Sequence, residues 1–212
     1  MSMPILVLGA GGHAKVLIDA LLTTSEVIAG VVDSDPALTG TTVLGVPVLG
    51  GDDVVGEFPP SEIMLVNGLG SVGLPVRRQL IFEKFKGIGY NFATVVHPSS
   101  VVADDTVLGE GAQVMAGVVI QPGSRIGCNA IINTSASVDH DCIIGDHTHI
   151  APGVTLSGGV KVGTGSHIGT GATVIQGIVI GEQSLVAAGA VVVFDVAGKA
   201  TVKGIPARVV LK

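Results

Sequence analysis

The chain has 212 residues, of which 47% are hydrophobic but only 3% aromatic, and it contains 32 glycines and no tryptophan. A formal net charge of −6 argues against a broad basic face for nucleic acid, so the expected partners are small molecules. No run of about 20 apolar residues could span a bilayer, and the apolar segment near the start lacks the basic flank of a signal peptide. We therefore expect no membrane insertion and a cytoplasmic location.

Residues 1–90 predict a small, Rossmann-like α/β domain. An apolar strand at 4–9 runs into a glycine turn, Gly9 to Ala14, and residues 15–22 continue with helical spacing. Backbone N–H groups at the start of such a helix, beside glycines that lack Cβ atoms, suit a diphosphate. A second strand, at 27–33, ends in Asp33-Ser34-Asp35, where a ribose hydroxyl or a base edge could be held.

A strand at 62–68 and a helix at 75–85 complete this first part of the chain. They leave room for only one mononucleotide-binding half, so a UDP-like ligand is favoured over NAD. Glycine turns also serve simply to close a strand against a helix. The turn alone therefore leaves nucleotide binding open.

Residues 91–212 predict a left-handed parallel β-helix of hexapeptide repeats. Every sixth residue from Val96 to Val192 is Val, Ile or Leu, seventeen positions in unbroken register. A period of six fits neither a lone helix nor a two-sided strand, but it is typical of a β-helix in which three hexads form one triangular coil. Side chains eighteen residues apart then stack at roughly 4.8 Å. We expect the aliphatic residue at the second place of each hexad to fill the core, beside the small residue at the sixth place.

His140 and Asp141 are the strongest catalytic candidates. Eighteen residues before them lie Pro122-Gly123 and eighteen after them lie Gly158-Gly159, so both flanking coils are trimmed at this point. The adjacent carboxylate can orient the imidazole and raise its basicity, as a general base near neutral pH requires. The simpler alternative is an exposed turn histidine among acidic residues.

His149 and His167 lie one coil apart and should stack on one face, where they could bind a ligand or a metal ion. Solenoid carbonic anhydrases resemble this chain in fold and use three histidines across a subunit boundary. That role would leave the N-terminal domain without a function, so no metal is expected. Structural roles are expected for two further histidines and for one cysteine. His97 should lie in a turn at the entrance of the solenoid, His147 in a solvated turn and Cys142 in the core.

Taken together, the motifs resemble those of bacterial sugar acetyltransferases of the UDP-N-acetylbacillosamine N-acetyltransferase and sialic acid O-acetyltransferase type, which are hexapeptide-repeat acyltransferases. The resemblance covers nearly the whole chain. It implies an enzyme that uses acetyl-CoA as co-substrate and forms a homotrimer. The motifs that carry it are GAGGHA at 9–14, DSD at 33–35, NGLG at 67–70 followed by Arg78, the run at 133–153 and GIPAR at 204–208.

The resemblance also implies roles for single residues. His140 would be the general base, and Asp141, where the bacillosamine enzymes have Glu, would raise its basicity. The acetyl-CoA contacts fall on His149, Thr170 and Ala188. The nucleotide-sugar contacts fall on Gly11, Gly12 and His13, with Ser34 and Asp35 at the uridine and Gly68 at the phosphate region.

Three functions are compatible with these patterns. The leading one is direct N-acetylation of a UDP-4-amino-4,6-dideoxy sugar, without an acyl-enzyme. The second is O-acetylation of a sialic acid or a related sugar, because the same base could activate a hydroxyl. The third is a non-catalytic nucleotide-sugar-binding protein. Four basic residues near the C-terminus could meet the phosphates of CoA or form a solvated end: Lys199, Lys203, Arg208 and Lys212.

Overall fold

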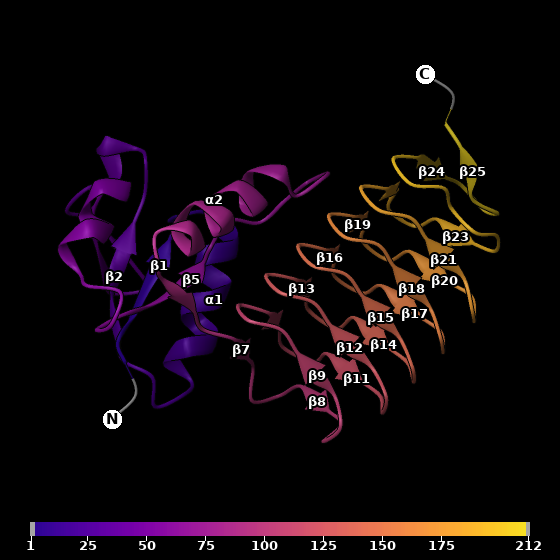
Figure 1. The fold of residues 1–212 in the computed structure, drawn as a ribbon, viewed down its shortest axis with the longest axis horizontal. Helices are drawn as coiled ribbons and strands as arrows, with labels where there is room; N and C mark the ends of the chain where they lie inside the picture. Colours follow the sequence, from indigo (N-terminus) through magenta and orange to yellow (C-terminus); the bar gives the residue numbers. More distant parts are fainter. Residues whose placement is uncertain (1–2, 211–212) are drawn as a thin grey trace.

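The computed structural model describes residues 3–210, which form an α/β domain followed by a parallel β-helix (Figure 1). The α/β domain lies beside the first coils, and the remaining coils extend away from it in a row. Among residues 3–210, no helix is long and apolar enough to cross a membrane.

The α/β domain is built on a six-stranded sheet in the order β3-β4-β2-β1-β5-β6, parallel except for the β3–β4 hairpin. The strands and helices expected at 4–9, 15–22, 27–33, 62–68 and 75–85 are all present. The elements are β1 Ile5–Leu8, α1 Gly12–Leu22, β2 Ile28–Val32, the 3-10 helix Pro36–Leu38, β3 Thr42–Val43, β4 Val46–Gly50, the 3-10 helix Asp52–Glu57, β5 Met64–Asn67, α2 Val76–Gly87 and β6 Asn91–Phe92.

The central strand β1 is buried on both faces. Ile5 and Val7 pack in one apolar cluster with residues of α1, whereas Leu6 and Leu8 pack in a second cluster with Phe82 and other residues of α2. Alternate side chains of a strand point to opposite faces, so the two helices cover opposite sides of the sheet. The carboxyl end of β1 is thereby held rigidly, and the glycine turn follows directly from it.

Each coil of the solenoid contributes one short strand to each of three parallel sheets. The first sheet contains β7 Val95–Val96, β10 Gln113–Val114, β13 Ile131–Ile132, β16 His149–Ile150, β19 His167–Ile168, β22 Leu185–Val186, β24 Thr201–Lys203 and the antiparallel β25 Arg208–Val209. The second contains β8 Val101–Val102, β11 Val119–Ile120, β14 Ser137–Val138, β17 Thr155–Leu156, β20 Thr173–Val174 and β23 Val191–Val192. The third contains β9 Val107–Leu108, β12 Arg125–Ile126, β15 Ile143–Ile144, β18 Lys161–Val162 and β21 Val179–Ile180.

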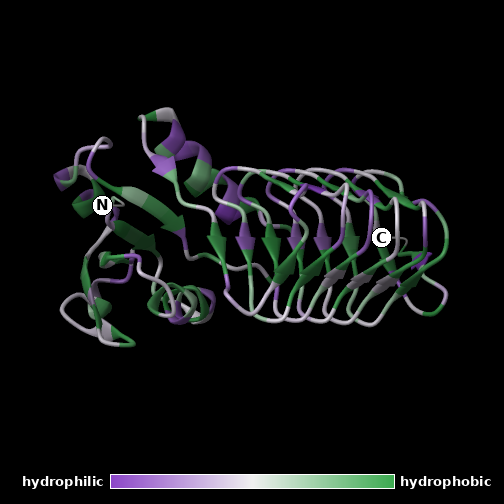
Figure 2. Cartoon of the chain, turned by 90° about the horizontal axis from the view of Figure 1, so that it is seen from below, coloured by the Kyte–Doolittle hydropathy of each residue, from purple (hydrophilic) through white to green (hydrophobic). Residues whose placement is uncertain are grey.

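The predicted register is confirmed, because residues eighteen apart pair throughout, as Ile132 does with Ile150 and His149 with His167. Figure 2 shows green, hydrophobic segments recurring in successive coils, with purple, hydrophilic segments among them. The second-place aliphatic residues are buried from Val114 to Val192. The expectation that all of them fill the core is wrong for the first coil, where Val96 is 38% exposed, because no coil stacks on its outer side.

Candidate functional site

A cleft of about 1000 Å³ lies between the α/β domain and the solenoid. On one side it is lined by every residue for which the resemblance implies a nucleotide-sugar contact: Gly11, Gly12, His13, Ser34, Asp35 and Gly68. On the other side, two of the three residues implied for acetyl-CoA, His149 and Thr170, line the same cleft. The fold therefore brings most of the predicted binding residues together around one space.

The glycine turn faces this space. Helix α1 begins at Gly12. Its N-cap residue, Gly11, has no side chain that could cap the first N–H groups of the helix. A Cβ atom added at either glycine would meet no atom within 4 Å. Free N–H groups at a helix start attract anions, and the open space in front of them suits a phosphate group.

Gly68 has a packing role as well. A Cβ atom on this residue would lie 2.6 Å from the carbonyl oxygen of Leu8 and 2.8 Å from the Cβ atom of Ala14. Only glycine lets the end of β5 approach β1 and α1 this closely. Its place at the cleft wall thus follows from the tight packing of these three elements.

The acidic end of β2 is tied to the glycine turn. The Asp33 carboxylate accepts hydrogen bonds from the backbone N–H of Ala10 at 2.7 Å and from that of Asp35 at 2.9 Å. The carboxylate of Asp35 accepts from the N–H of Ala37 at 2.9 Å and caps a short 3-10 helix. Ser34 and Asp35 are left exposed at the rim of the cleft.

Three histidine rings lie in a row along the cleft. The predicted stacking of His149 and His167 is confirmed, with ring centroids 4.8 Å apart, and the ring of His13 lies 6.5 Å from that of His149. Burial, together with neighbouring positive charge, lowers the pKa of His13 to about 4 and that of His149 to about 2. Burial also lowers the pKa of His167. All three rings are therefore neutral near pH 7.

Arg78, in α2, ties the wall of the cleft to the solenoid. It is fully buried, and its guanidinium donates to the carbonyl oxygens of Asn67 at 2.6 Å, Leu69 at 2.8 Å and Asn129 at 3.2 Å. Burial lowers its pKa to about 9. Because Asn129 belongs to the solenoid, the guanidinium holds the segment after β5 against the coils and so fixes the position of that segment in the cleft.

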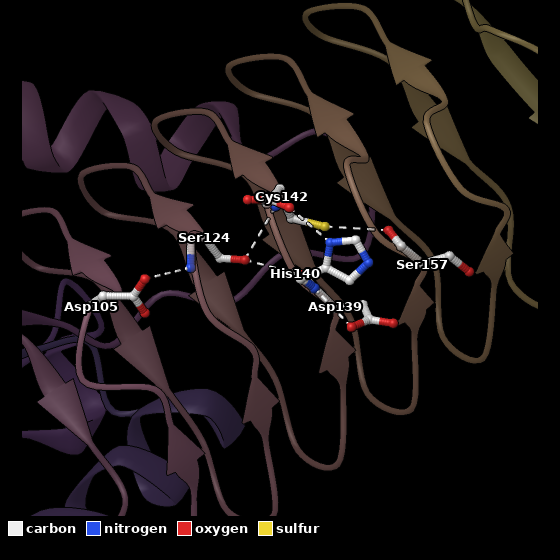
Figure 3. Close-up of polar contacts among 8 residues, drawn as sticks. Asp105, Ser124, Asp139, His140, Cys142 and Ser157 are labelled. Atoms are coloured by element: carbon white, nitrogen blue, oxygen red, sulfur yellow. Dashed lines mark hydrogen bonds and ion pairs between the residues drawn. The ribbon is translucent and has the colours of Figure 1, made fainter.

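His140 lies on the turn between β14 and β15, at a corner of the solenoid (Figure 3). Its Nδ1 atom is 2.8 Å from Oδ2 of Asp141, and its backbone N–H donates to Asp139 at 2.8 Å. The hydrogen bond that the ring donates to the Asp141 carboxylate is the main cause that raises the pKa of His140 above its ordinary value. Since Nδ1–H donates to the carboxylate, Nε2 carries the free lone pair of the neutral ring.

The coils on either side of His140 and Asp141 carry glycines next to these side chains, as predicted. A Cβ atom on Gly158 would overlap the His140 ring, and one on Gly123 would overlap the Asp141 carboxylate. Neither His140 nor Asp141 lines the cleft of its own chain, and neither does Ala188. Ala188 does lie one coil beyond Thr170, at the same corner, as the N–H of Gly189 bonds to the Thr170 carbonyl at 2.9 Å.

The solvated turn expected at His147 is wrong. This ring is only 8% exposed, lies edge-on to Phe82 at 5.5 Å and is 2.9 Å from the amide nitrogen of Asn129. Helix α2 packs over this turn, which the hexad pattern alone does not indicate. The other structural expectations are confirmed, because His97 accepts a turn bond from the N–H of Ser99 and Cys142 is fully buried.

The basic residues near the C-terminus are dispersed. The Lys199 ammonium lies 4.0 Å from the Glu182 carboxylate, and the Arg208 guanidinium lies 5.2 Å above the Phe194 ring. Lys212 is outside the described residues. Within residues 3–210, no group of three or more His, Cys, Asp or Glu side chains is arranged to hold a metal ion.

The polar partners of the histidines were not predicted. Gln113 bonds to His13 at 2.8 Å, Asn133 to His149 at 3.1 Å, and the hydroxyl of Ser71 lies 2.8 Å from Nδ1 of His149. The eighteen-residue count could have found Gln113, which occupies the same strand position two coils before His149. Ser71 lies outside the repeat, and no periodic signal points to it.

In a comparison with known proteins, each of the two parts of the chain matches a protein family. Residues 4–85 match the family described as PglD N-terminal domain, and residues 123–158 match the bacterial transferase hexapeptide family with six repeats. A search of curated proteins gives no match.

Several solved structures are similar over the full length. Perosamine N-acetyltransferase from Caulobacter crescentus, solved with CoA and GDP-perosamine as a variant with one histidine replaced by asparagine, is 39% identical, with 100% of both chains covered and a TM-score of 0.92. The acetyltransferase domain of PglB from Neisseria gonorrhoeae, in complex with acetyl coenzyme A, is 34% identical, covering 99% of this chain and 100% of that one, with a TM-score of 0.89. WeeI from Acinetobacter baumannii is 29% identical over 99% of this chain and 100% of that one, with a TM-score of 0.86.

Proposed function

The chain belongs to the PglD-type family of hexapeptide-repeat sugar N-acetyltransferases, and from this membership we propose that it transfers the acetyl group of acetyl-CoA to the 4-amino group of a nucleotide-linked 4-amino-4,6-dideoxy sugar. One observation carries the proposal: the open glycine turn at the start of α1 faces His149 and Thr170 across a single cleft. A diphosphate at the turn would direct the attached sugar toward the coils.

The nucleotide in the leading proposal is UDP, because the α/β domain offers one mononucleotide site at the glycine turn. GDP is the second candidate, since the relative from Caulobacter crescentus was solved with GDP-perosamine. In either case Ser34 and Asp35, at the rim of the cleft, lie where the nucleoside would be held.

His140 acts as the general base in this proposal. The sugar nitrogen attacks the thioester carbonyl carbon of acetyl-CoA while Nε2 of His140 takes a proton from the amine. The C–S bond then breaks, and the CoA thiolate leaves as a thiol by taking that proton from the imidazolium. Asp141 holds the Nδ1–H and stabilises the charged ring. General-base catalysis of this kind contributes about 10²- to 10⁴-fold to the rate.

The acetyl-CoA contacts proposed are His149, Thr170 and Ala188. Thr170 and Ala188 lie on adjacent coils at one corner of the solenoid, which we call the Thr170 corner. An extended pantetheine arm running along the coils would pass both in turn. This direction is supported by Thr170 lining the cleft and Ala188 lying exposed one coil further on.

We propose a homotrimer in which His140 of one subunit completes the cleft of another. The sheet from β8 to β23 separates the Thr170 corner from the turn that carries His140. Its outward first-place residues are uncharged, whereas the sheet from β9 to β21 presents Arg125 and Lys161. Packing the uncharged faces together would bring one subunit's His140 to another's Thr170 corner. The uncharged residues are Val101, Val119, Ser137, Thr155, Thr173 and Val191.

A subunit-mixing experiment tests this arrangement. One variant carries His140→Ala with an intact cleft, and the other carries Gly12→Val, which blocks the glycine turn but leaves His140 intact. Each alone should be inactive. Co-expressed, the two should regain activity, because some sites combine an intact cleft with an intact base. A mixture without activity, or a fully active monomer in sedimentation, would contradict the shared site.

The reaction itself is tested by incubating the protein with acetyl-CoA and a panel of acceptors, following free thiol and product mass. The panel contains UDP- and GDP-linked 4-amino-4,6-dideoxy sugars, the matching 4-hydroxy sugars and sialic acids. Thiol release should require the amino sugar and give an amide that resists mild alkali. An alkali-labile ester from a sialic acid would indicate the O-acetyltransferase function instead. Tight sugar binding without thiol release would indicate a non-catalytic protein.

A further inference from the structure

Ser71 links two of the cleft histidines through one hydroxyl group. Its Oγ atom lies 2.8 Å from Nδ1 of His149 and 3.3 Å from Nδ1 of His167. Ser71 comes from the segment between β5 and α2, whereas both histidines are on the solenoid. A hydroxyl has a single proton to donate. It can therefore donate to one ring only, and the other ring must donate to it.

The amide of Asn133 sets the direction of this chain of hydrogen bonds. The backbone N–H of Thr134 donates to Oδ1 of Asn133 at 2.8 Å, so the amide oxygen faces the backbone and Nδ2 faces His149. Nδ2 then donates to Nε2 of His149 at 3.1 Å. In a neutral imidazole only one nitrogen carries a proton, so the proton of His149 is on Nδ1 and is donated to Ser71.

The orientation of His167 follows from the same chain. With its oxygen accepting from His149, the Ser71 hydroxyl donates its own proton to Nδ1 of His167. The proton of the neutral His167 ring is then on Nε2. Within residues 3–210, Nε2 of His167 has no hydrogen-bond partner, and the ring lines the cleft. His167 thus offers an N–H donor to a ligand.

His13 has the opposite polarity. Nε2 of Gln113 donates to the carbonyl oxygen of Asn67 at 2.8 Å, so its Oε1 accepts from Nε2–H of His13 at 2.8 Å. The proton-free Nδ1 of His13 is an acceptor in the same cleft. The row of rings therefore presents an acceptor beside the glycine turn and a donor beside Thr170, on the side proposed for acetyl-CoA.

We propose that Ser71 is a positioning residue that fixes His167 as an Nε2–H donor to a carbonyl oxygen of the acetyl-CoA. The identity of that ligand rests on the proposed function, whereas the proton positions rest on the hydrogen bonds alone. His167 is adjacent to His149 in the sheet and three residues before Thr170, so its donor meets the acyl donor rather than the nucleotide. Through Ser71, the α/β domain thereby orients a hydrogen-bond donor in the half of the site that is proposed to bind acetyl-CoA.

The experiment uses the full-length protein, labelled with ¹⁵N-histidine, as wild type, Ser71→Ala and Ser71→Thr. In the wild type, the spectra should show His149 protonated at Nδ1 and His167 at Nε2. Ser71→Ala should give His167 a mixture of both forms and raise the KM for acetyl-CoA about three- to tenfold, the effect of one hydrogen bond. The KM for the nucleotide sugar should change less than twofold, and Ser71→Thr should restore both readouts.

The control is Ser99→Ala, because Ser99 makes the same kind of bond, at 2.8 Å to Nδ1 of His97, and neither residue lines the cleft. It should leave the His167 spectrum and both KM values unchanged. Protonation of wild-type His167 at Nδ1, or a Ser71→Ala variant with unaltered His167 signals, would overturn the positioning role. An increase confined to the nucleotide-sugar KM would overturn the assignment to acetyl-CoA. If the wild type releases no thiol, the proposed function fails while the spectra still report the proton positions.

Discussion

The Oδ2 atom of Asp141 lies 2.8 Å from the Nδ1 atom of His140, its neighbour in the chain. This bond orients the ring with Nε2 free, and it is the main cause that raises the pKa of His140. A carboxylate beside a histidine stabilises the protonated ring. The base is thereby strengthened, and its activity must be lost on acidification at a higher pH than for an isolated imidazole.

Asp141→Asn should shift the acid limb of the kcat/KM profile to lower pH. The base works only when deprotonated, so activity falls as the pH drops through the His140 pKa, and removing the carboxylate lowers that pKa. At pH 8 the weaker base should also reduce kcat. Asp195→Asn is the control, because Asp195 occupies the same hexad place three coils on. An acid limb unmoved by Asp141→Asn would refute the role of this carboxylate.

Gly158→Ala should displace the His140 ring, which a Cβ atom at this position would overlap. Because the overlapping atoms belong to the exposed end of a side chain that can rotate away, we expect little loss of stability but a large fall in kcat. Pro122 and Gln176 occupy the same place in other coils, so the backbone accepts side chains there. Urea unfolding should show a stability close to that of the wild type, whereas turnover, measured as free thiol, should fall strongly. Turnover at the wild-type rate would contradict this contact.

Gly11→Ala should impair nucleotide-sugar binding without harming the fold. A Cβ atom at Gly11 meets no protein atom within 4 Å, so the change in stability should stay within about 1 kcal/mol. The methyl group would occupy the space proposed for the diphosphate, raising the KM for the sugar at least tenfold and leaving that for acetyl-CoA unchanged. Gly56→Ala, also without atoms within 4 Å but outside the cleft, is the matched control.

Folding stability should decrease between pH 7 and pH 5 because the buried cleft histidines resist protonation. The pKa of His13 is lowered from 6.5 to about 4, so below pH 6.5 the unfolded chain binds a proton that the folded chain does not. At pH 5 this amounts to about 2 kcal/mol for His13. Urea unfolding should show that His13→Gln loses less stability over this range than the wild type. Equal losses would contradict a neutral, buried His13.

The hexad register predicts much of the site because a β-helix repeats its geometry every eighteen residues. Counting along the chain was sufficient to pair His149 with His167 and to place Gly158 over His140. The count describes neighbours within the solenoid and nothing outside it. The burial of His147 under α2 and the hydrogen bond between His149 and Ser71 depend on how the α/β domain docks, which involves contacts between residues far apart in the sequence. Val96 is exposed because it lies in the first coil, which has no coil stacked on its outer side.

The buried Arg78 shows the same limit. The sequence identifies Arg78 as part of the motif that begins with NGLG at 67–70. Its partners, however, are the backbone carbonyls of Asn67, Leu69 and Asn129, which no side-chain pattern reveals. The sequence therefore predicts which residues line the two halves of the cleft better than it predicts what holds the halves together.

The most direct test of the central claim is the turnover of His140→Ala with acetyl-CoA and the preferred nucleotide amino sugar, measured as free thiol. If His140 is the general base of direct acetyl transfer, kcat should fall about 10²- to 10⁴-fold, while KM values for both substrates change little. Turnover at the wild-type rate would show that another group removes the proton and would contradict the account.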